Sequence, residues 1–534
     1  MGAGTMAELP PARRRDVLWA RLAARHHSSP IWLLAIVGAT GAALAIPLLG
    51  VVYQGATAGG TAARHVLSGP VLPTLLLHTL YLTTIVSLSC GVLGLAAAWL
   101  VERTDMPFRR VLAVFLVLPL AVPEYVAGYS WVSLSPRIQG LAGASFVMTL
   151  SLYPLVYLPI AASLRRSDPA LDEVAQGLGL GPVTRFVRIT LPSIARPLVG
   201  GMLLVAMYLL AEYGAFAILR YKTFATAIYT QYTLGFDGQA ASVLTLVLCL
   251  IGVILLMGES RIAAARHPGR ESGRPAHRTL LGAGRWVAVG AVAVLCALAI
   301  GVPVGSITYW MVRGSSTTLP PGSVVRTTLQ SLGLGAAAAA AATALALPVA
   351  IMSVRHSGPF ARTVERTAYL NRALPGIAVG LTFVTLTVHH VRSLYQTTHL
   401  LEAAYVVLFF PLALVALRPA VARVPPSLDE AARSLGATPL GVIRRLTIPL
   451  ILPGLAAAAT LVWLSATTEL TATLLLRPTG LETLATRFWV YATGLAYGAA
   501  APYAAIMIAM SIVPVALLTR LSRAPGSADR HVTP

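Results

Sequence analysis

The stretch at residues 168–192 reads DPALDEVAQGLGLGPVTRFVRITLP, and residues 425–449 repeat its pattern as PPSLDEAARSLGATPLGVIRRLTIP. A shift of 257 positions aligns the two stretches. Identical residues at matching positions include Pro169 and Pro426, Asp172 and Asp429, Glu173 and Glu430, Ala175 and Ala432, and Gly179 and Gly436. We call these two stretches the first and second repeated segments. They are polar and charged, whereas the chain around them is apolar, so each marks the same place in a duplicated unit.

The composition of the chain predicts a membrane protein with many spans. Of its 534 residues, 56% are hydrophobic and 11% are charged, and the mean hydropathy is +0.75. Soluble domains carry about 25% charged residues, so this chain has less than half the usual charge. The net charge of +21 does not indicate a nucleic-acid-binding protein, because the arginines gather at the ends of apolar runs, as in membrane proteins.

Twelve apolar stretches are long enough to cross a bilayer, for which about 20 residues are needed. They lie near residues 31–53, 74–101, 111–134, 142–164, 194–219, 239–258, 286–311, 326–354, 368–389, 400–420, 451–476 and 497–520. The expected divisions are an N-terminal arm (1–30), a first six-helix domain (31–258), a linker (259–285), a second six-helix domain (286–520) and a tail (521–534). The fold class is therefore all-α and polytopic, with a tandem repeat of six helices.

Charge and sequence similarity both support this division. Arginines are dense in the connections that follow even-numbered spans and sparse in the others, which places both termini, the linker and both repeated segments in the cytoplasm. VERTDMPFRR at residues 101–110 matches SVRHSGPFAR at residues 353–362, and Glu212 matches Glu469. Because six is an even number, both copies have the same orientation, related by an axis along the membrane normal.

Each repeated segment has the features of one short helix. Proline at the first position suits a helix start, the pair Asp172 and Glu173 suits the positive end of the helix dipole, and Gly179 is placed to end the helix. Leu171, Ala175 and Leu178 form one small apolar face; the second copy repeats it with Leu428, Ala432 and Leu435. Two such helices favour a partner with two equivalent grooves, with binding flat on the lipid surface as the alternative.

The repeated segments resemble the EAA signature of permeases of ABC importers. The matching residues are Glu173, Val174, Ala175, Gly179, Leu191 and Pro192, then Glu430, Ala431, Ala432, Gly436, Ile448 and Pro449; Val174 replaces the usual alanine. The resemblance implies the fold of type I importers in a bacterial cell membrane. It also implies that Asp172, Glu173, Ala175 and Gly179, with Asp429, Glu430, Ala432 and Gly436, form coupling helices for two ATP-binding-cassette subunits, and that an extracytoplasmic binding protein delivers the substrate.

The sequence predicts no ATPase site on this chain. A phosphate-binding loop requires a Gly-Lys-Ser/Thr sequence, and the only lysine, Lys222, follows Tyr221. We therefore expect no enzyme activity and no cofactor on this chain, with ATP and Mg²⁺ used by the partner ATPase.

Carboxylates inside membrane spans are costly and are candidates for function. Glu124, Glu212 and Glu469 lie within predicted spans, and Tyr125 and Tyr129 follow Glu124. We expect these five residues to line the translocation pathway, although Glu212 and Glu469 could instead brace neighbouring helices. No metal site is expected: His389, His390 and His399 could bind a metal, but histidines in a short polar loop are more often solvated.

The substrate is indicated by resemblance alone. The fused twelve-helix form, and residues 211–236 in particular, resemble the permeases of iron(III) importers, with importers of thiamine, polyamines or phosphonates as alternatives. A secondary transporter driven by an ion gradient is the rival of another class. It would not explain two matching helices on the cytoplasmic side.

Overall fold

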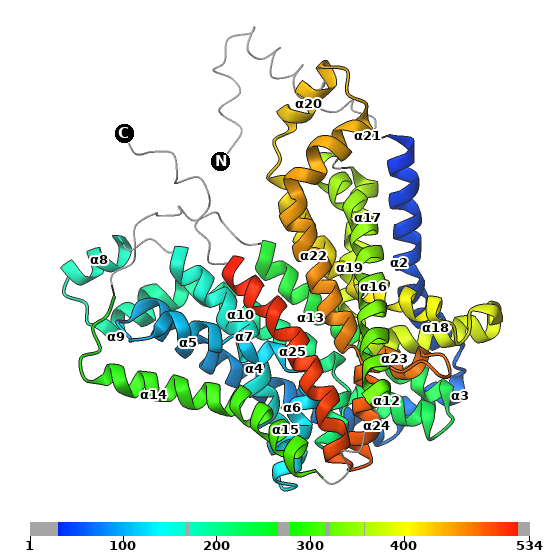
Figure 1. The fold of residues 1–534 in the computed structure, drawn as a ribbon, viewed down its shortest axis with the longest axis horizontal. Helices are drawn as coiled ribbons and strands as arrows, with labels where there is room; N and C mark the ends of the chain where they lie inside the picture. Colours follow the sequence, from blue (N-terminus) through cyan, green and yellow to red (C-terminus); the bar gives the residue numbers. More distant parts are fainter. Residues whose placement is uncertain (1–29, 167–169, 265–277, 315–320, 357, 522–534) are drawn as a thin grey trace.

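A computed structural model describes residues 30–166, 170–264, 278–314, 321–356 and 358–521. Figure 1 shows two groups of helices that diverge from a common region. In the described residues every element is helical, apart from one isolated bridge between Thr104 and Thr279. The predicted all-α fold is confirmed.

The elements of the two halves correspond to one another. The first half contains α2 (Ile31–Thr57), α3 (Gly60–Ser68), α4 (Val71–Arg103), α5 (Arg109–Phe115), η1 (Leu118–Ala121), α6 (Glu124–Leu134), α7 (Gly140–Arg166), α8 (Ala170–Gly177), α9 (Pro182–Arg185), η2 (Phe186–Thr190), α10 (Leu191–Ala211), α11 (Gly214–Ile218), α12 (Phe224–Thr233) and α13 (Gly238–Ala264). The second half contains α14 (Gly284–Cys296), η3 (Ala297–Gly301), α15 (Val302–Arg313), α16 (Pro321–Arg355), α17 (Pro359–Leu370), η4 (Asn371–Ala373), α18 (Gly376–His390), η5 (Arg392–Leu394), α19 (Thr398–Ala422), α20 (Pro426–Ser434), α21 (Pro439–Val442), η6 (Ile443–Thr447), α22 (Ile448–Thr468), α23 (Thr471–Leu476), α24 (Leu484–Thr493) and α25 (Tyr497–Leu521).

The helices account for the predicted spans. Among the described residues, nine helices are long and apolar enough to cross a membrane, and two bent pairs of helices reach that length together. The last predicted span rests on a shorter apolar helix, Tyr497–Ile512. The polytopic membrane fold expected from the composition is thus confirmed.

The third span of each half is bent rather than straight. Residues 111–134, predicted as one helix, form the pair Arg109–Ala121 and Glu124–Leu134, which meet at 92°. Residues 368–389 belong to a matching pair bent by 107°. Pro123 and Pro375 precede the second helix of each pair. Proline lacks the N–H that a continuous helix needs, which explains the break.

The fifth and eleventh spans begin and end earlier than predicted. They run over Val183–Ala211 and Leu440–Thr468, not over residues 194–219 and 451–476. A π-helical turn precedes the prolines near the start of α10 and α22, and its wider backbone accommodates the missing N–H. The helices therefore continue through Pro192 and Pro449.

Each half lends its first helix to the other half. The helix α2 contacts α13 of its own half and α17 of the second half, and α15 contacts α25 of its own half and α6 of the first half. Figure 1 shows α2 (blue) beside the second half and α14 (green) along the first. Leu33 and Val37 accordingly belong to the apolar core of the second half, and Val292 belongs to that of the first.

Both ends of the connection between the halves pack against or extend the helices of the first half. The helix α13 extends to Ala264, six residues into the predicted linker. At the far end of the linker, Thr279 pairs with the α4–α5 connection, and the Leu281 N–H donates to Asp105 Oδ1 at 2.9 Å. The N-terminal arm, residues 265–277 and the tail after Leu521 lie outside the described residues.

A buried asparagine secures the exchanged helix α2. Asn371 is 1% exposed, and its Nδ2 donates to the Leu44 carbonyl at 2.8 Å and to the Thr367 carbonyl at 3.0 Å. We predict that Asn371→Ala lowers the free energy of unfolding by about 1–2 kcal/mol, because two buried hydrogen bonds are lost. Thermal unfolding of the detergent-solubilised complex measures this. Thr363→Ala, which removes an exposed hydroxyl from α17, should leave the transition unchanged.

Candidate functional site

The two repeated segments form matching short helices, as predicted. Both helices end in a left-handed glycine, Gly179 with φ +76° and Gly436 with φ +86°. The N–H of the residue after each glycine, Leu180 or Ala437, donates to the carbonyl five residues back, at 3.1 and 3.0 Å. This is the Schellman arrangement of a helix end. A side chain at either glycine would strain the backbone, which explains why both copies carry glycine there.

The acidic pair of the second repeated segment has two different environments. Asp429 is 5% exposed and forms an ion pair with Arg355 at the end of α16, whereas the Glu430 side chain is exposed. Asp429 thus attaches α20 to the membrane-spanning helices, while the Glu430 side chain lies at the surface. The side chains of Asp172 and Glu173, the matching pair, lie outside the described part of the structure.

The apolar face expected on each repeated helix is divided between packing and exposure. Ala175 is 4% exposed and packs inward, whereas Leu178 and Leu435 are 75% and 88% exposed. Large apolar side chains this exposed on a short polar helix are typical of a surface that a partner covers. Figure 1 shows α8 and α20 at separate ends of the two groups of helices.

A continuous helix leads from each repeated segment to a buried break. Residues 183–211 and 440–468 are helical throughout, a length of about 43 Å at 1.5 Å per residue. Glu212 and Glu469 are the next residues and have extended backbone conformations. One continuous helix therefore connects each repeated segment to the residue at the break.

Glu212 and Glu469 cap the short helix that follows each break. Glu212 Oε1 accepts the Ala215 N–H at 2.7 Å, and Glu469 Oε1 accepts the Ala472 N–H at 3.0 Å. The two bonds occupy matching positions and satisfy backbone groups that the break exposes, which lipid could not do. The bracing role considered for these glutamates is therefore present in the structure. Both side chains remain half-buried.

Glu124 brings a third carboxyl group close to this pair. It begins α6, is half-buried and shares a hydrogen bond with the Tyr208 hydroxyl. Glu124, Glu212 and Glu469 lie within electrostatic range of one another. Tyr208 lies one turn before Glu212 and is 43% exposed although it is in the middle of a span. The structure thus brings together three carboxyl groups that are far apart in the sequence.

The site is asymmetric because the second half has a glycine at the position where the first half has Glu124. Gly376 occupies the position in α18 that Glu124 occupies in α6, one residue after the proline at the bend. A Cβ atom on Gly376 would lie 2.7 Å from Glu469 Oε1. The missing side chain therefore provides the space in which Glu469 sits.

Tyr125 and Tyr129 join the halves and are fully buried. The Tyr125 hydroxyl donates to the Thr468 carbonyl at 3.0 Å, and the Tyr129 hydroxyl donates to the Tyr497 carbonyl at 2.7 Å. Their exposed fractions are 4% and 1%. Tyr125 thus lies next to the break at Glu469, while Tyr129 packs against the ring of Phe488. Lining of the pathway by these two tyrosines stays a prediction.

An aromatic cluster that the sequence did not indicate joins the two halves after the breaks. The Tyr213 ring packs at a tilt against Tyr229 of its own half at 4.5 Å and against Trp489 of the other half at 5.3 Å, measured between ring centroids. These residues follow the breaks at Glu212 and Glu469 in the chain, so they lie on the side away from α8 and α20. The halves are therefore joined on that side. The position of Tyr213 directly after Glu212 was the only signal in the sequence.

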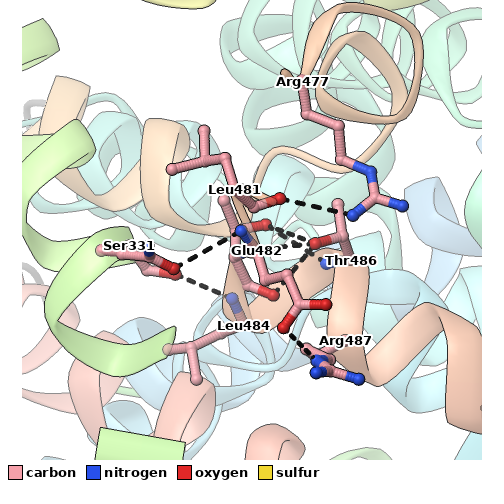
Figure 2. Close-up of polar contacts among 9 residues, drawn as sticks. Ser331, Arg477, Leu481, Glu482, Leu484, Thr486 and Arg487 are labelled. Carbon is pink, nitrogen blue, oxygen red and sulfur yellow. Dashed lines mark hydrogen bonds and ion pairs between the residues drawn. The ribbon is translucent and has the colours of Figure 1, made fainter. Parts of the chain in front are cut away.

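The segments after the breaks are tied to the second span of each half. Figure 2 shows the tie in the second half: Ser331 of α16 accepts the Leu484 N–H at 2.7 Å, and Glu482 forms an ion pair with Arg487. In the first half, the Tyr221 hydroxyl donates to the His78 carbonyl of α4 at 2.9 Å. These contacts hold the aromatic cluster in position.

The described residues contain no group of three histidine, cysteine or acidic side chains placed to hold a metal ion. His389 is exposed and contacts the Thr385 carbonyl, and His399 pairs with Glu402 at 3.7 Å. The three cysteines are buried and unbonded to one another.

Two matching halves of membrane helices, each with a short exposed helix, define a duplicated membrane permease. Residues 91–258 and 330–525 match the family described as binding-protein-dependent transport system inner membrane component. The chain belongs to this family, whose members act with a substrate-binding protein and an ATP-binding-cassette partner.

Individual relatives cover different shares of the chain. The Fe(3+)-transport system permease protein FbpB 2 of Haemophilus influenzae is 33% identical over 497 residues, 92% of this chain and 98% of the relative. The sulfate transport system permease protein CysT of Escherichia coli is 27% identical over 234 residues, 40% of this chain and 84% of the relative. The spermidine/putrescine permease PotB of Salmonella typhimurium is 27% identical over 158 residues, 26% of this chain and 55% of the relative.

The contact between Gly376 and Glu469 gives a test of the site. We predict that Gly376→Ala displaces the Glu469 carboxyl group, weakens the cap on α23 by about 1 kcal/mol and reduces transport. The readouts are thermal unfolding and uptake into proteoliposomes. Gly333→Ala is the control, because Gly333 lies in α16 with open space around its Cβ position. Equal behaviour of the two variants would show that the carboxyl group has room to move.

Proposed function

We propose that this chain is the permease subunit of an ATP-driven importer for ferric iron delivered by an extracytoplasmic binding protein. The likeness to the Fe(3+)-transport permease over nearly the whole length of both chains carries the proposal. The sulfate, molybdenum and polyamine permeases match at most two fifths of this chain. Ferric iron is the transported cargo and not a resident cofactor.

The charge of the central site supports a cationic cargo. Carboxyl groups repel sulfate, molybdate and phosphonate and attract cations, and this effect is strong where water is excluded. Glu124, Glu212 and Glu469 lie together between the halves, and none of the ion pairs among the described residues includes any of them. Within the family's range of substrates, iron, polyamines and thiamine therefore fit better than the oxyanions.

The repeated segments would couple transport to ATP. Each would dock into one of two ATP-binding-cassette subunits in the cytoplasm, where both termini would also lie. Closure of these subunits on ATP would draw α8 and α20 together. The long helices that end at Glu212 and Glu469 would then separate the halves at the aromatic cluster and open the carboxyl groups to the binding protein.

This chain would supply no ATPase chemistry. The absence of a Gly-Lys-Ser/Thr loop in the sequence supports a division of labour in which the partner subunits use ATP and Mg²⁺. A secondary transporter would need no exposed coupling helices, so the matched helices α8 and α20 favour the ATP-driven alternative.

Uptake in a defined system tests the substrate. With the partner ATPase and binding protein reconstituted in proteoliposomes, we expect ATP-dependent uptake of radioactive ferric iron, and no uptake of sulfate or molybdate. Uptake of spermidine or thiamine in preference to iron would refute the iron assignment and leave the importer intact. Uptake that survives without ATP and collapses with an ionophore would refute both the iron assignment and the ATP-driven importer.

Substitution of the paired glutamates separates capping from charge. Glutamine keeps the oxygen that accepts the Ala215 or Ala472 N–H but removes the charge. We predict that Glu212→Gln and Glu469→Gln unfold at the same temperature as the unmodified complex and lower iron uptake about tenfold, or about 1.4 kcal/mol of barrier. The alanine variants should lose stability as well. Unchanged uptake in both glutamine variants would leave the glutamates with a bracing role alone.

Charge reversal on the repeated segments tests the coupling. We predict that the double variant Glu173→Arg and Glu430→Arg loses substrate-stimulated ATP hydrolysis, because the exposed Glu430 and its counterpart in the first repeated segment would meet the partner grooves. Glu402→Arg, on α19 away from both segments, is the control. Hydrolysis that still responds to loaded binding protein in the double variant would contradict the docking assignment.

A further inference from the structure

A cavity of about 560 Å³ lies between α2 and α13 of the first half and α18 of the second half. Its lining includes Gly50, Gln54, Gly238, Leu381 and Thr382. The volume is typical of a small-molecule or lipid site. None of the carboxyl groups of the central site lines it, so it is a separate feature.

The duplication explains how the cavity arises. A shift of 252 places Tyr129 and Ser130 at the positions of Leu381 and Thr382. Trp310 and Gln54 each lie three residues before the end of their helix, and Tyr497 and Gly238 each begin theirs. There the Tyr129 hydroxyl donates to the Tyr497 carbonyl, and the rings of Trp310 and Tyr497 lie 5.1 Å apart. Three large rings fill the matching space, and their replacement by smaller side chains empties this one.

Two polar side chains inside the cavity have no partner. Gln54 is 6% exposed and Thr382 is 1% exposed, and Gln54 Oε1 and Thr382 Oγ1 form no hydrogen bond. A buried polar atom without a partner costs free energy. An occupant that offers hydrogen-bonding groups next to an apolar body would satisfy both atoms.

The mouth of the cavity faces the membrane. Ile46 and Tyr53 line the cavity and are 39% and 58% exposed, and both belong to α2, a membrane-spanning helix. Exposed apolar side chains on such a helix are covered by acyl chains. His389 and His390, which also line the cavity, are exposed at the end of α18 and can donate hydrogen bonds to a phosphate.

We propose that this cavity binds one membrane phospholipid. The phosphate lies at His389 and His390, a hydroxyl or ammonium group of the headgroup donates to Gln54 Oε1, and an ester carbonyl accepts from the Thr382 hydroxyl. An acyl chain fills the apolar part beside Leu381. Because α18 belongs to the second half and α2 to the first, the lipid joins the two halves on one side of the molecule.

Photo-labelling tests the proposal. The complete transport complex is placed in nanodiscs of phosphatidylglycerol and phosphatidylethanolamine that contain a phospholipid with a diazirine in its acyl chain. After photolysis, we expect labelled peptides from α2 and α18. The double variant Gln54→Trp and Leu381→Tyr, which copies the filled side, should lose this labelling. Leu49→Trp, an exposed position on α2, should keep it.

A second pair of variants keeps the test decisive if the filled variant does not assemble. His389→Gln with His390→Gln changes only exposed side chains and should reduce labelling by the phospholipid, but not by a diazirine fatty alcohol without phosphate. Labelling that the filled variant retains, equal labelling of both probes in the histidine variant, or a small polar solute found in the cavity by native mass spectrometry would each overturn the proposal.

Discussion

The structure depends on how two interruptions of membrane helices are satisfied. A helix in lipid cannot end within the bilayer unless the freed backbone groups find partners. Glu212 and Glu469 supply those partners, because each carboxylate accepts an N–H from the short helix that follows. The same side chains place ionisable carboxyl groups between the halves. The glutamine variants separate the contribution of the cap from that of the ionisable group.

Departures from symmetry give the molecule its specific features. Two identical halves would place four carboxyl groups at the centre. Gly376 occupies the position in the second half that matches Glu124 in the first, so only three carboxyl groups are present. Two identical halves would also fill both spaces between first and third spans, but Gln54 and Leu381 leave one of them open. The repeat thus supplies the framework, and substitutions in one copy make the central carboxyl site asymmetric and shape the lining of the cavity beside α2.

Much of the fold was predictable, because the composition and the hydrophobic periodicity of a segment depend on whether it lies in lipid or in water. The spans, the duplication and the short helices ended by Gly179 and Gly436 followed from local signals. The bends at Pro123 and Pro375 and the breaks at Glu212 and Glu469 were missed, since a hydropathy pattern does not register a change of direction. The three central glutamates were found because charge in an apolar run is conspicuous. Tyr208, Tyr213 and Trp489 were missed because aromatic residues in membrane helices are common, and only the packing of the two halves sets these apart.

The exchanged first helix has a consequence for the order of assembly. The helix α2 is synthesised first, yet one of its packing partners, α17, follows about 300 residues later; contacts between such distant parts of a chain form slowly. Until α17 is inserted, α2 contacts only its own half and the bilayer. Even in the complete molecule, only 28% of the most apolar part of α2 is buried. A nascent chain that stops after its first half would therefore be inserted without these packing partners. Its helix α2 and the surface that α14 covers in the complete molecule would both face lipid. Fusion of the halves in one polypeptide keeps these late partners at high local concentration.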